Sequence, residues 1–448
     1  MGIAGDSVVI LAAGIGSRLQ SNLPKVFHKI GGLALLDHVI KAAKGINPTE
    51  IAAVLNPKYN DADLKFFAAV KRANQDTPRG TADAVKCGLK LLSDDSSGWV
   101  YILYGDIPLI SSETLRRWFS VTEKCAKTAV VILAMNSDKD NDLGKLELTD
   151  ESGVVQSVVE ASDAPHTNVV SNLCNAGLLV KKSLLRKFIG ELKPNPQTGE
   201  FYITDIVQLA CKAGYVCRYY EGDRKELLGA NTRAELATLE RIFQDRERAR
   251  HLSNGVTLVA PETVFFSHDT HIERDVTVHP YVVFSENVYI RSGAQVGPFC
   301  MIEGATVGDA KVGPFSRLRT GTDVRSGVKV GNFVEIKNSI IAENSRVNHL
   351  SYIGDASLGR DVNIGAGTIT CNYDGFKKYK TEIGDDVFIG SNTALVAPIK
   401  VQDHAIVGAG SVVVSDVASG ALVIARGNQK NIENGAINFR RIKKCAES

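Results

Sequence analysis

Beyond Gly255, aliphatic and phenylalanine residues recur every six positions, with a few five-residue steps. A helix cannot hold a period of six on one face, whereas a β-solenoid places each such residue in an interior row of stacked coils. The pattern therefore predicts a β-solenoid over 255–448, with one interruption near 370–382 that should project as a loop. The repeating positions are 272, 278, 284, 290, 296, 302, 312, 318, 324, 330, 336, 341, 347, 353, 358, 364, 383, 389, 395, 401, 407 and 413.

Before residue 230 the pattern is different. Apolar runs such as Val100–Tyr104 and Ala129–Ala134 alternate with helical patterns such as Leu33–Ala43 and Ala82–Leu92. This alternation predicts an α/β domain over 1–229, Rossmann-like with a largely parallel sheet. A charged stretch over 230–254 then predicts a linker helix, because three apolar residues share one stripe of it: Leu236, Leu239 and Phe243.

The run Val8–Leu11 leads into a glycine-rich turn, Gly14-Ile15-Gly16. Without side chains at 14 and 16, backbone N–H groups can close around an anion, and a following helix would add its positive dipole end. Arg18 and Lys25 supply cationic donors beside the turn. The dinucleotide fingerprint would need glycine or alanine at position 19, and a P-loop would need Gly-Lys-Ser/Thr. The residues alone allow a phosphate site or a tight turn without a ligand.

Several short motifs resemble sugar-phosphate nucleotidylyltransferases. Leu-Ala-Ala-Gly-x-Gly-Ser-Arg begins at Leu11, and Leu-Pro-Lys ends at Lys25. Gln75, Gly80-Thr81-Ala82 and Tyr104-Gly105-Asp106 follow in the order and spacing of that family. The resemblance implies that the glycine-rich loop binds a nucleoside triphosphate.

Composition narrows the class of protein. Lys and Arg number 52 against 50 Asp and Glu, so a net charge of +2 favours neither nucleic acid nor an anionic membrane as a partner. No apolar run approaches the length that spans a membrane, and no secretory leader is recognised, so we expect a cytoplasmic enzyme. The eight cysteines form no C-x-x-C pair, which argues against a zinc site or a disulfide framework.

Three segments of the solenoid extend the resemblance to nearly the whole chain. They are Gly331–Lys337, His349–Asp355 and Asn363–Gly375. Together with the first domain, they are similar to the bacterial bifunctional N-acetylglucosamine-1-phosphate uridylyltransferase / glucosamine-1-phosphate N-acetyltransferase family. The resemblance implies a left-handed parallel β-helix, a homotrimer with acetyltransferase pockets between neighbouring chains, and small-molecule substrates only.

For the first domain, the family's reaction joins UTP to N-acetylglucosamine 1-phosphate with Mg²⁺. The resemblance implies Asp106 and Asn231 as metal ligands. On residue type alone, Asp106 is a strand-end turn residue and Asn231 a helix N-cap. The residues implied in binding UTP and the sugar phosphate are Leu11, Ala12, Gly14, Arg18, Lys25, Gln75, Gly80, Thr81, Tyr104, Gly144, Glu160, Asn175 and Asn231.

For the solenoid, the family's reaction acetylates glucosamine 1-phosphate from acetyl-CoA. His349 matches the catalytic base, a role that suits histidine because its ordinary pKa is about 6.5. The residues implied for glucosamine 1-phosphate are Arg319, Lys337, Tyr352, Asn363 and Lys378. Those implied for acetyl-CoA are Ala366, Asn372, Tyr373, Ser391, Ala409 and Arg426.

The chain departs from the family pattern at four positions. Ile15 replaces a basic residue, Asp83 and Leu143 stand where His and Tyr are common, and Ser162 replaces a Lys. These changes affect expectations about substrate affinity, not about the reaction. One alternative is a monofunctional nucleotidylyltransferase with a regulatory solenoid, but this predicts degeneration of the 349–375 segment, which is intact. A second alternative is a solenoid that serves only as a non-catalytic trimerisation scaffold, which predicts neither a histidine base nor a projecting loop, and the sequence indicates both.

Overall fold

The computed structural model describes residues 5–58, 70–95, 97–137, 143–149, 153–160 and 171–446. Ser162 lies outside these residues. The chain divides into two compact units, one reaching to Arg246 and one beginning at Glu247. The division falls inside the long helix α7 (Arg233–Ser253), so the first unit extends past the expected boundary at residue 229. The two units are described separately.

The first unit is built on a nine-stranded sheet within the described residues. Its main path runs β11-β7-β10-β6-β1-β4-β5, and β10 is antiparallel to both neighbours. A hairpin of β8 and β9 joins this path at β10. The strands are β1 (Ser7–Ala12), β4 (Glu50–Leu55), β5 (Lys71–Asn74), β6 (Trp99–Tyr104), β7 (Thr128–Asn136), β8 (Lys145–Leu148), β9 (Val155–Val159), β10 (Leu173–Lys181) and β11 (Val216–Glu221), with a separate small pair β2 (Lys29–Ile30) and β3 (Leu33–Ala34).

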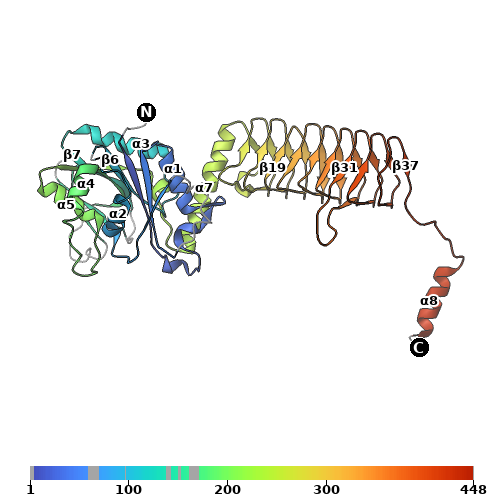
Figure 1. Ribbon diagram of the computed structural model, residues 1–448, viewed down its shortest axis with the longest axis horizontal. Coiled ribbons are helices and arrows are strands. Elements are labelled where there is room, and N and C mark those ends of the chain that lie inside the picture. Colours follow the sequence, from blue (N-terminus) through green and yellow to red (C-terminus); the bar gives the residue numbers. More distant parts are fainter. Residues whose placement is uncertain are drawn as a thin grey trace. The chain divides into compact units, whose positions relative to one another are not determined.

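Helices cover both faces of this sheet (Figure 1). Helices α1 (Leu35–Lys44) and α3 (Ser112–Ser120) pack on one face, and α2 (Thr81–Leu89), α4 (Lys182–Phe188) and α5 (Ile206–Lys212) on the other. Strands covered on both faces are apolar along their whole length, as in the buried run Val8–Ile10 of β1. The short elements are η1 (Ser17–Leu19), η2 (Lys25–Phe27), η4 (Val121–Lys124), η6 (Ile203–Asp205) and α6 (Arg224–Leu227).

The first half of α7 belongs to the core of the first unit. Leu239 and Phe243 are buried with Ile30, Leu35 and Leu109. Gly31 has a φ of 52°, and a Cβ there would lie 2.2 Å from the Phe243 ring, so only glycine allows this approach. The stripe expected on the linker helix is therefore confirmed as a packing face.

The second unit is a parallel β-helix (Figure 1). In its described residues, three parallel sheets of ten, eight and eight strands run along the stack. The ten-stranded sheet holds β12 (Thr257–Leu258), β14 (Thr277–Val278), β17 (Gln295–Val296), β20 (Lys311–Val312), β23 (Lys329–Asn332), β26 (Arg346–His349), β29 (Asn363–Ile364), β32 (Phe388–Ile389), β35 (Ile406–Val407) and β37 (Leu422–Val423).

The two eight-stranded sheets complete each coil. One holds β13 (His271–Ile272), β16 (Tyr289–Ile290), β19 (Ala305–Val307), β22 (Thr322–Val324), β25 (Ile340–Ile341), β28 (Ala356–Leu358), β31 (Thr381–Ile383) and β34 (Ile399–Val401). The other holds β15 (Val283–Phe284), β18 (Met301–Ile302), β21 (Arg317–Arg319), β24 (Glu335–Lys337), β27 (Tyr352–Gly354), β30 (Ile369–Cys371), β33 (Ala394–Val396) and β36 (Val412–Val413).

The interior rows are those that the period of six predicts. Ile272, Val330, Ile353 and Val407 are among the buried residues of one continuous core. The interruption leaves the stack between β30 and β31 and projects as a loop (Figure 1). The remaining elements are η7 (Pro261–Thr263) and α8 (Gly435–Ala446). The left hand of the β-helix stays a prediction.

In the described part of the chain, no helix is both long and apolar enough to cross a membrane. Seven cysteines are free thiols in this part of the chain: Cys87, Cys125, Cys174, Cys211, Cys217, Cys300 and Cys371.

Candidate functional sites

The first candidate site lies where β1 and β6 end side by side. Leu11 and Tyr104 are register partners, and Gly105 N donates to the Leu11 carbonyl at 2.8 Å. A Cβ on Gly105 would lie 3.0 Å from the Ala12 side chain. Carboxyl ends of parallel strands gather functional residues in such sheets. Asp106 follows directly and is thus held at this edge.

Lys25, Asp106 and Asn231 converge here. The Lys25 ammonium forms an ion pair with the Asp106 carboxylate and donates to the Asn231 side-chain oxygen. All three come from different segments, which the fold brings together. The structure therefore places Asp106 and Asn231, the two expected metal ligands, around the ammonium group of Lys25.

The chemistry of this donor set fits Mg²⁺. A carboxylate and an amide oxygen are hard ligands, and Mg²⁺ takes few protein oxygens and completes its shell with water and substrate phosphates. Because one ammonium nitrogen contacts both oxygens, the two oxygens already converge on a point that a cation can occupy.

Asn231 is not the helix cap that its residue type suggests. The Thr232 hydroxyl accepts from Glu235 N at 3.2 Å, while the Glu235 carboxylate accepts from Thr232 N at 2.8 Å and from Asn231 N at 2.6 Å. Thr232 and Glu235 therefore form a capping box. This box leaves the Asn231 side chain directed at Lys25.

The glycine-rich loop approaches Lys25 closely. Gly16 has a φ of 71°, and a Cβ there would lie 2.6 Å from Lys25 Cβ. Arg18 is exposed on η1, and Gly14 and Ile15 are exposed before it. The loop is followed by a single 3₁₀ turn, not by the longer helix that was expected to add its dipole. An anion bound at this loop would therefore depend on backbone N–H groups and on the two cations.

Gln75 and the Gly80-Thr81 turn form a second part of this site. The buried Gln75 amide donates to Gly80 O at 3.1 Å and to the Asp83 carboxylate at 2.9 Å. Asp83, the departure from the family pattern, thus orients Gln75. Gly80 has a φ of 102°, and a Cβ there would meet the carbonyl oxygen of Phe201 at 2.5 Å.

The residues implied for the sugar meet beside Tyr104. Asn175 Nδ2 donates to the Tyr104 hydroxyl at 2.9 Å, and Asn175 N donates to Gly144 O at 2.8 Å. A Cβ on Gly144 would lie 3.1 Å from Glu160 Oε2. Burial, with Glu160 nearby, raises the pKa of Tyr104 well above its ordinary value, so its hydroxyl stays protonated.

Sequence reasoning missed Thr204, whose hydroxyl donates to Glu160 Oε1. Ile203 N, next to it, donates to the Thr81 hydroxyl at 3.0 Å, so η6 touches both parts of the site. No spacing signal links positions 81, 160 and 204, because the contact is set by the tertiary fold.

The second candidate site lies on the β-helix around His349. His349 is two residues past the interior Val347, and Ala366, Ser391 and Ala409 stand at the same offset in the following coils. They continue the column of His349 along the ten-stranded sheet. Arg426 lies beyond it, and its guanidinium donates to Ala409 O at 2.7 Å. Because the side chains of Ala366, Ser391 and Ala409 are small, this part of the column projects little from the surface of the β-helix.

A cluster of cations lies on the adjoining sheet and the projecting loop. The side-chain contact with Lys337, and then the positive charge of Lys337, lower the pKa of Lys378. Lys378 reaches this position because the loop folds back, with Tyr373 and Lys378 bridged. Two cations held this close favour an anion between them. Arg319 lies one coil earlier and pairs with Glu335 at 2.8 Å.

Tyr352 and Asn372 lie beside this cluster. A Cβ on Gly354 would meet the Tyr352 hydroxyl at 2.4 Å and the Asn372 amide at 2.8 Å. Buried Asp355 accepts from Asn372 and, at 2.6 Å, from Asn338. Asn363 lies on the ten-stranded sheet with the column, and Tyr373 is exposed on the loop.

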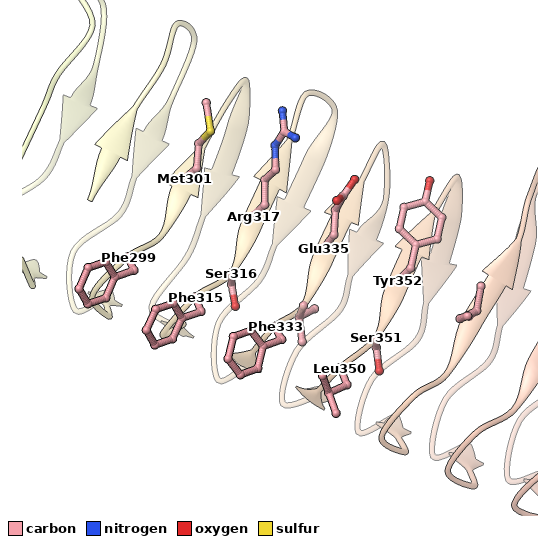
Figure 2. Close-up of a pocket in the computed structure, with 12 residues that line it drawn as sticks. Phe299, Met301, Phe315, Ser316, Arg317, Phe333, Glu335, Leu350, Ser351 and Tyr352 are labelled. Atoms are coloured by element: carbon pink, nitrogen blue, oxygen red, sulfur yellow. The ribbon is translucent and has the colours of Figure 1, made fainter. Parts of the chain in front are cut away.

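An apolar groove follows one corner of the β-helix. Figure 2 shows Phe299, Phe315, Phe333 and Leu350 in one row, and Met301, Arg317, Glu335 and Tyr352 in a second row on successive strands. The rings stack at centroid distances of 4.9 Å and 5.3 Å between Phe299, Phe315 and Phe333. About half of each ring is exposed, which is unusual for a row of large apolar side chains.

Comparison with known proteins covers both units. A MobA-like NTP transferase domain matches residues 8–175, and a bacterial transferase hexapeptide of six repeats matches residues 380–415. The bifunctional protein GlmU of Paramagnetospirillum magneticum is 41% identical over 438 residues, or 97% of this chain and 96% of the relative. Those of Wolbachia pipientis and Zymomonas mobilis are 42% and 40% identical, covering 94% and 98% of this chain and 97% and 98% of the relatives.

The chain belongs to the GlmU family. The expected resemblance is confirmed, and so is the fold class of a nucleotidyltransferase domain followed by a β-helix of hexapeptide repeats. A GlmU chain is bifunctional along its length, so this protein combines a nucleotidyltransferase with a hexapeptide acyltransferase. The alternative with a non-catalytic solenoid is not favoured.

Proposed function

We propose that this protein makes UDP-N-acetylglucosamine in two steps. The β-helix acetylates glucosamine 1-phosphate with acetyl-CoA, and the first unit then transfers UMP from UTP to N-acetylglucosamine 1-phosphate. The product supplies cell-wall and lipopolysaccharide precursors, and because UTP and acetyl-CoA are cytoplasmic metabolites, we place the protein in the cytoplasm. The observation that carries the proposal is that each unit holds its own separate group of converging polar residues.

In uridylyl transfer, a phosphate oxygen of the sugar phosphate attacks the α-phosphorus of UTP. One P–O bond forms, the bond to the β-phosphate oxygen breaks, and pyrophosphate leaves. Positioning and charge neutralisation account for most of such catalysis. Lys25 and Arg18 neutralise the phosphates, and Gln75 and Thr81 hold the base. Glu160 accepts hydrogen bonds from sugar hydroxyls, and Asn175 donates to them.

Asp106 and Asn231 are the residues that would hold Mg²⁺. When bound, the ion supplies charge neutralisation between the two phosphate groups. Lys25, which contacts both oxygens, would then turn its ammonium to the phosphates.

In acetyl transfer, the amine of glucosamine 1-phosphate attacks the thioester carbonyl. A C–N bond forms, the C–S bond breaks, and the thiol of CoA leaves. His349 takes the proton of the attacking amine. Lys337 and Lys378 hold the 1-phosphate, and Tyr352 and Asn372 orient the sugar. The column Ala366, Ser391 and Ala409 holds the pantetheine arm, with Arg426 at the CoA phosphates.

We also propose a homotrimer. The exposed row of Phe299, Phe315, Phe333 and Leu350 supports this assembly, because a large apolar surface is stabilised when a second chain covers it. Closed cyclic symmetry is the usual outcome for such surfaces. A trimer would also complete each acetyl-CoA site with residues of a neighbouring chain.

Two matched variants test the two-step proposal. Asp106→Ala should lower uridylyl transfer by at least ~100-fold while acetyl transfer stays near wild type, because a metal ligand is lost. His349→Ala should do the reverse, since removal of a general base costs about 10²- to 10⁴-fold. Each half-reaction is assayed separately on both purified variants, so each variant controls for the folding of the other. Loss of both activities in one folded variant, or of neither, would contradict the assignment.

A further inference from the structure

The imidazole of His349 contacts a side chain on the preceding coil. His349 Nδ1 lies 3.0 Å from Asn332 Oδ1. The two residues are register partners in β26 and β23. Neighbouring strands lie ~4.8 Å apart, so the stacking of coils itself brings the two side chains together. Asn332 therefore belongs to the same column as His349, one position before it.

The backbone at this corner is fixed independently of that contact. The His349 carbonyl accepts from Ser351 Oγ at 2.8 Å and from Gly367 N at 3.3 Å. Leu350 N donates to Asn332 O at 3.1 Å, and both Phe333 and Leu350 have positive φ values, 56° and 49°. The chain thus turns in the same way after each residue. The backbone sets the direction of the Asn332 and His349 side chains, and the contact with Asn332 therefore acts on the imidazole of His349 alone.

We propose that Asn332 is a positioning residue for acetyl transfer. Its Oδ1 accepts the Nδ1 proton of His349, so the lone pair of Nε2 is left to take the proton of the attacking amine. A neutral imidazole carries one ring proton, and the hydrogen bond at one nitrogen decides which nitrogen is the base. An imidazole free in water favours the opposite form, with the proton on Nε2. The inference rests on the proposed function, in which His349 is the base.

Two substitutions distinguish a role of Asn332 as a hydrogen-bond acceptor from a role in packing alone. Asn332→Ala removes the acceptor, and we expect kcat for acetyl transfer to fall by about 10- to 100-fold, the range measured when partners of ligating histidines are removed. KM values should change by less than about twofold, because Asn332 does not bind substrate. Asn332→Asp keeps an acceptor that cannot donate, and it should restore kcat to within about threefold of wild type by the same argument.

A similar pair elsewhere in the β-helix provides a matched control. His404 Nδ1 lies 3.1 Å from Asp386 Oδ2 on the preceding coil, outside the candidate site. Asp386 has a φ of 55°, so Asp386→Gly removes this acceptor without backbone strain. This variant should leave acetyl transfer unchanged, which separates loss of a histidine contact in general from loss at the site.

The direct readout is the ring proton. Solid-state ¹⁵N NMR of histidine-labelled full-length protein should show His349 protonated at Nδ1 in wild type and Asn332→Asp, and mainly at Nε2 in Asn332→Ala, with His349→Gln assigning the signals. An inactive Asn332→Asp beside an active Asn332→Ala would overturn the inference, as would an unchanged ring state in Asn332→Ala. Full acetyl transfer in His349→Gln would instead refute the proposed base, and the NMR result would then report position alone.

Discussion

His251 lies near the end of α7 and is fully buried in the second unit. Its ring stacks on Phe266 at 4.6 Å, and Arg250 Nη2 lies 3.1 Å from its Nε2. Within the described residues, its Nδ1 has no hydrogen-bond partner. Burial first, and then the charges of Arg250 and His271, lower the pKa of His251 to about 4. The folded unit therefore holds this histidine neutral.

This burial predicts a pH dependence of stability. The unfolded chain binds a proton at His251 below about pH 6.5 and the folded chain only below about pH 4, so the free energy of unfolding falls as pH falls through that window. The loss at pH 4 is about 3 kcal/mol, from 1.36 kcal/mol per pKa unit. In His251→Phe, which keeps the stack, this part of the slope should vanish. Urea unfolding at several pH values measures the difference.

Two comparisons make the pH test specific. Burial raises the pKa of Asp6 to about 6, which acts with the opposite sign in the same window, but Asp6 lies in the first unit and is unaltered by the variant. His404→Gln, at an exposed histidine of the second unit, should keep the part of the slope that His251 contributes. Equal slopes in wild type and His251→Phe would show that His251 titrates freely in the folded chain.

At the scale of single residues, the sequence indicated which side chains converge better than it indicated their contacts. Lys25 was named from its motif, Asp106 and Asn231 were named from the family resemblance, and the fold brings the three together. The Thr232-x-x-Glu235 capping box was also readable in the sequence, yet Asn231 was taken as the cap on type alone. Thr204 and Asn332 could not be found that way, because their partners lie 44 and 17 positions away.

At the scale of elements, the glycines beside the interior rows differ in how tightly the coils approach them. Gly331 and Gly408 both follow an interior valine in the ten-stranded sheet. A Cβ on Gly331 would lie 1.9 Å from the Asn348 carbonyl oxygen, whereas the nearest atom to a Cβ on Gly408 is Val423 O at 3.3 Å. The backbone of the next coil cannot move away from Gly331 without breaking its own ladder.

Alanine at these two positions should therefore have unequal effects. Gly331→Ala should lower the free energy of unfolding of the β-helix by more than ~2 kcal/mol, and Gly408→Ala by less than ~1 kcal/mol. Urea unfolding followed by circular dichroism compares them in the full-length protein. Acetyl transfer should also fall in Gly331→Ala, because Asn332 is the next residue. Similar stabilities of the two variants would show that the coils separate easily at this corner.

The elements themselves were predictable to different degrees. A period of six predicts the β-helix because each coil buries one residue per face, and the interior rows follow directly. Alternating runs predicted a largely parallel sheet but not the antiparallel β10 or the β8–β9 hairpin, because strand direction depends on connections that hydrophobic patterning does not encode.

At the scale of the whole molecule, the first unit needs part of α7. Residues 1–229 lack Asn231 as well as Leu239 and Phe243, which cover Ile30 and Leu35. Residues 1–246 keep all of them. We expect the longer fragment to be folded, monomeric and active in uridylyl transfer, and the shorter one to lose at least ~100-fold in activity through loss of a metal ligand.

Light scattering and activity assays on fragments test this division. Residues 247–448 should be trimeric and retain acetyl transfer, since the exposed phenylalanine row and the His349 column both lie there. An active 1–229 fragment would show that α7 is dispensable for the first site. A monomeric but fully active 247–448 fragment would refute the proposal that neighbouring chains share the acetyl-CoA site.

Because the coils stack at a constant spacing, the number of coils sets distances along the axis of the β-helix. Five strand-to-strand steps separate β12, the first strand of the ten-stranded sheet, from β26, which carries His349. At ~4.8 Å a step, the first coil and the base are ~24 Å apart along the axis. Each coil touches only its neighbours. Gaining or losing a whole coil therefore changes this distance by one strand-to-strand spacing and leaves the coils around His349 intact. An insertion shorter than a whole coil cannot join the stack and must project from it as a loop, as the segment between β30 and β31 does.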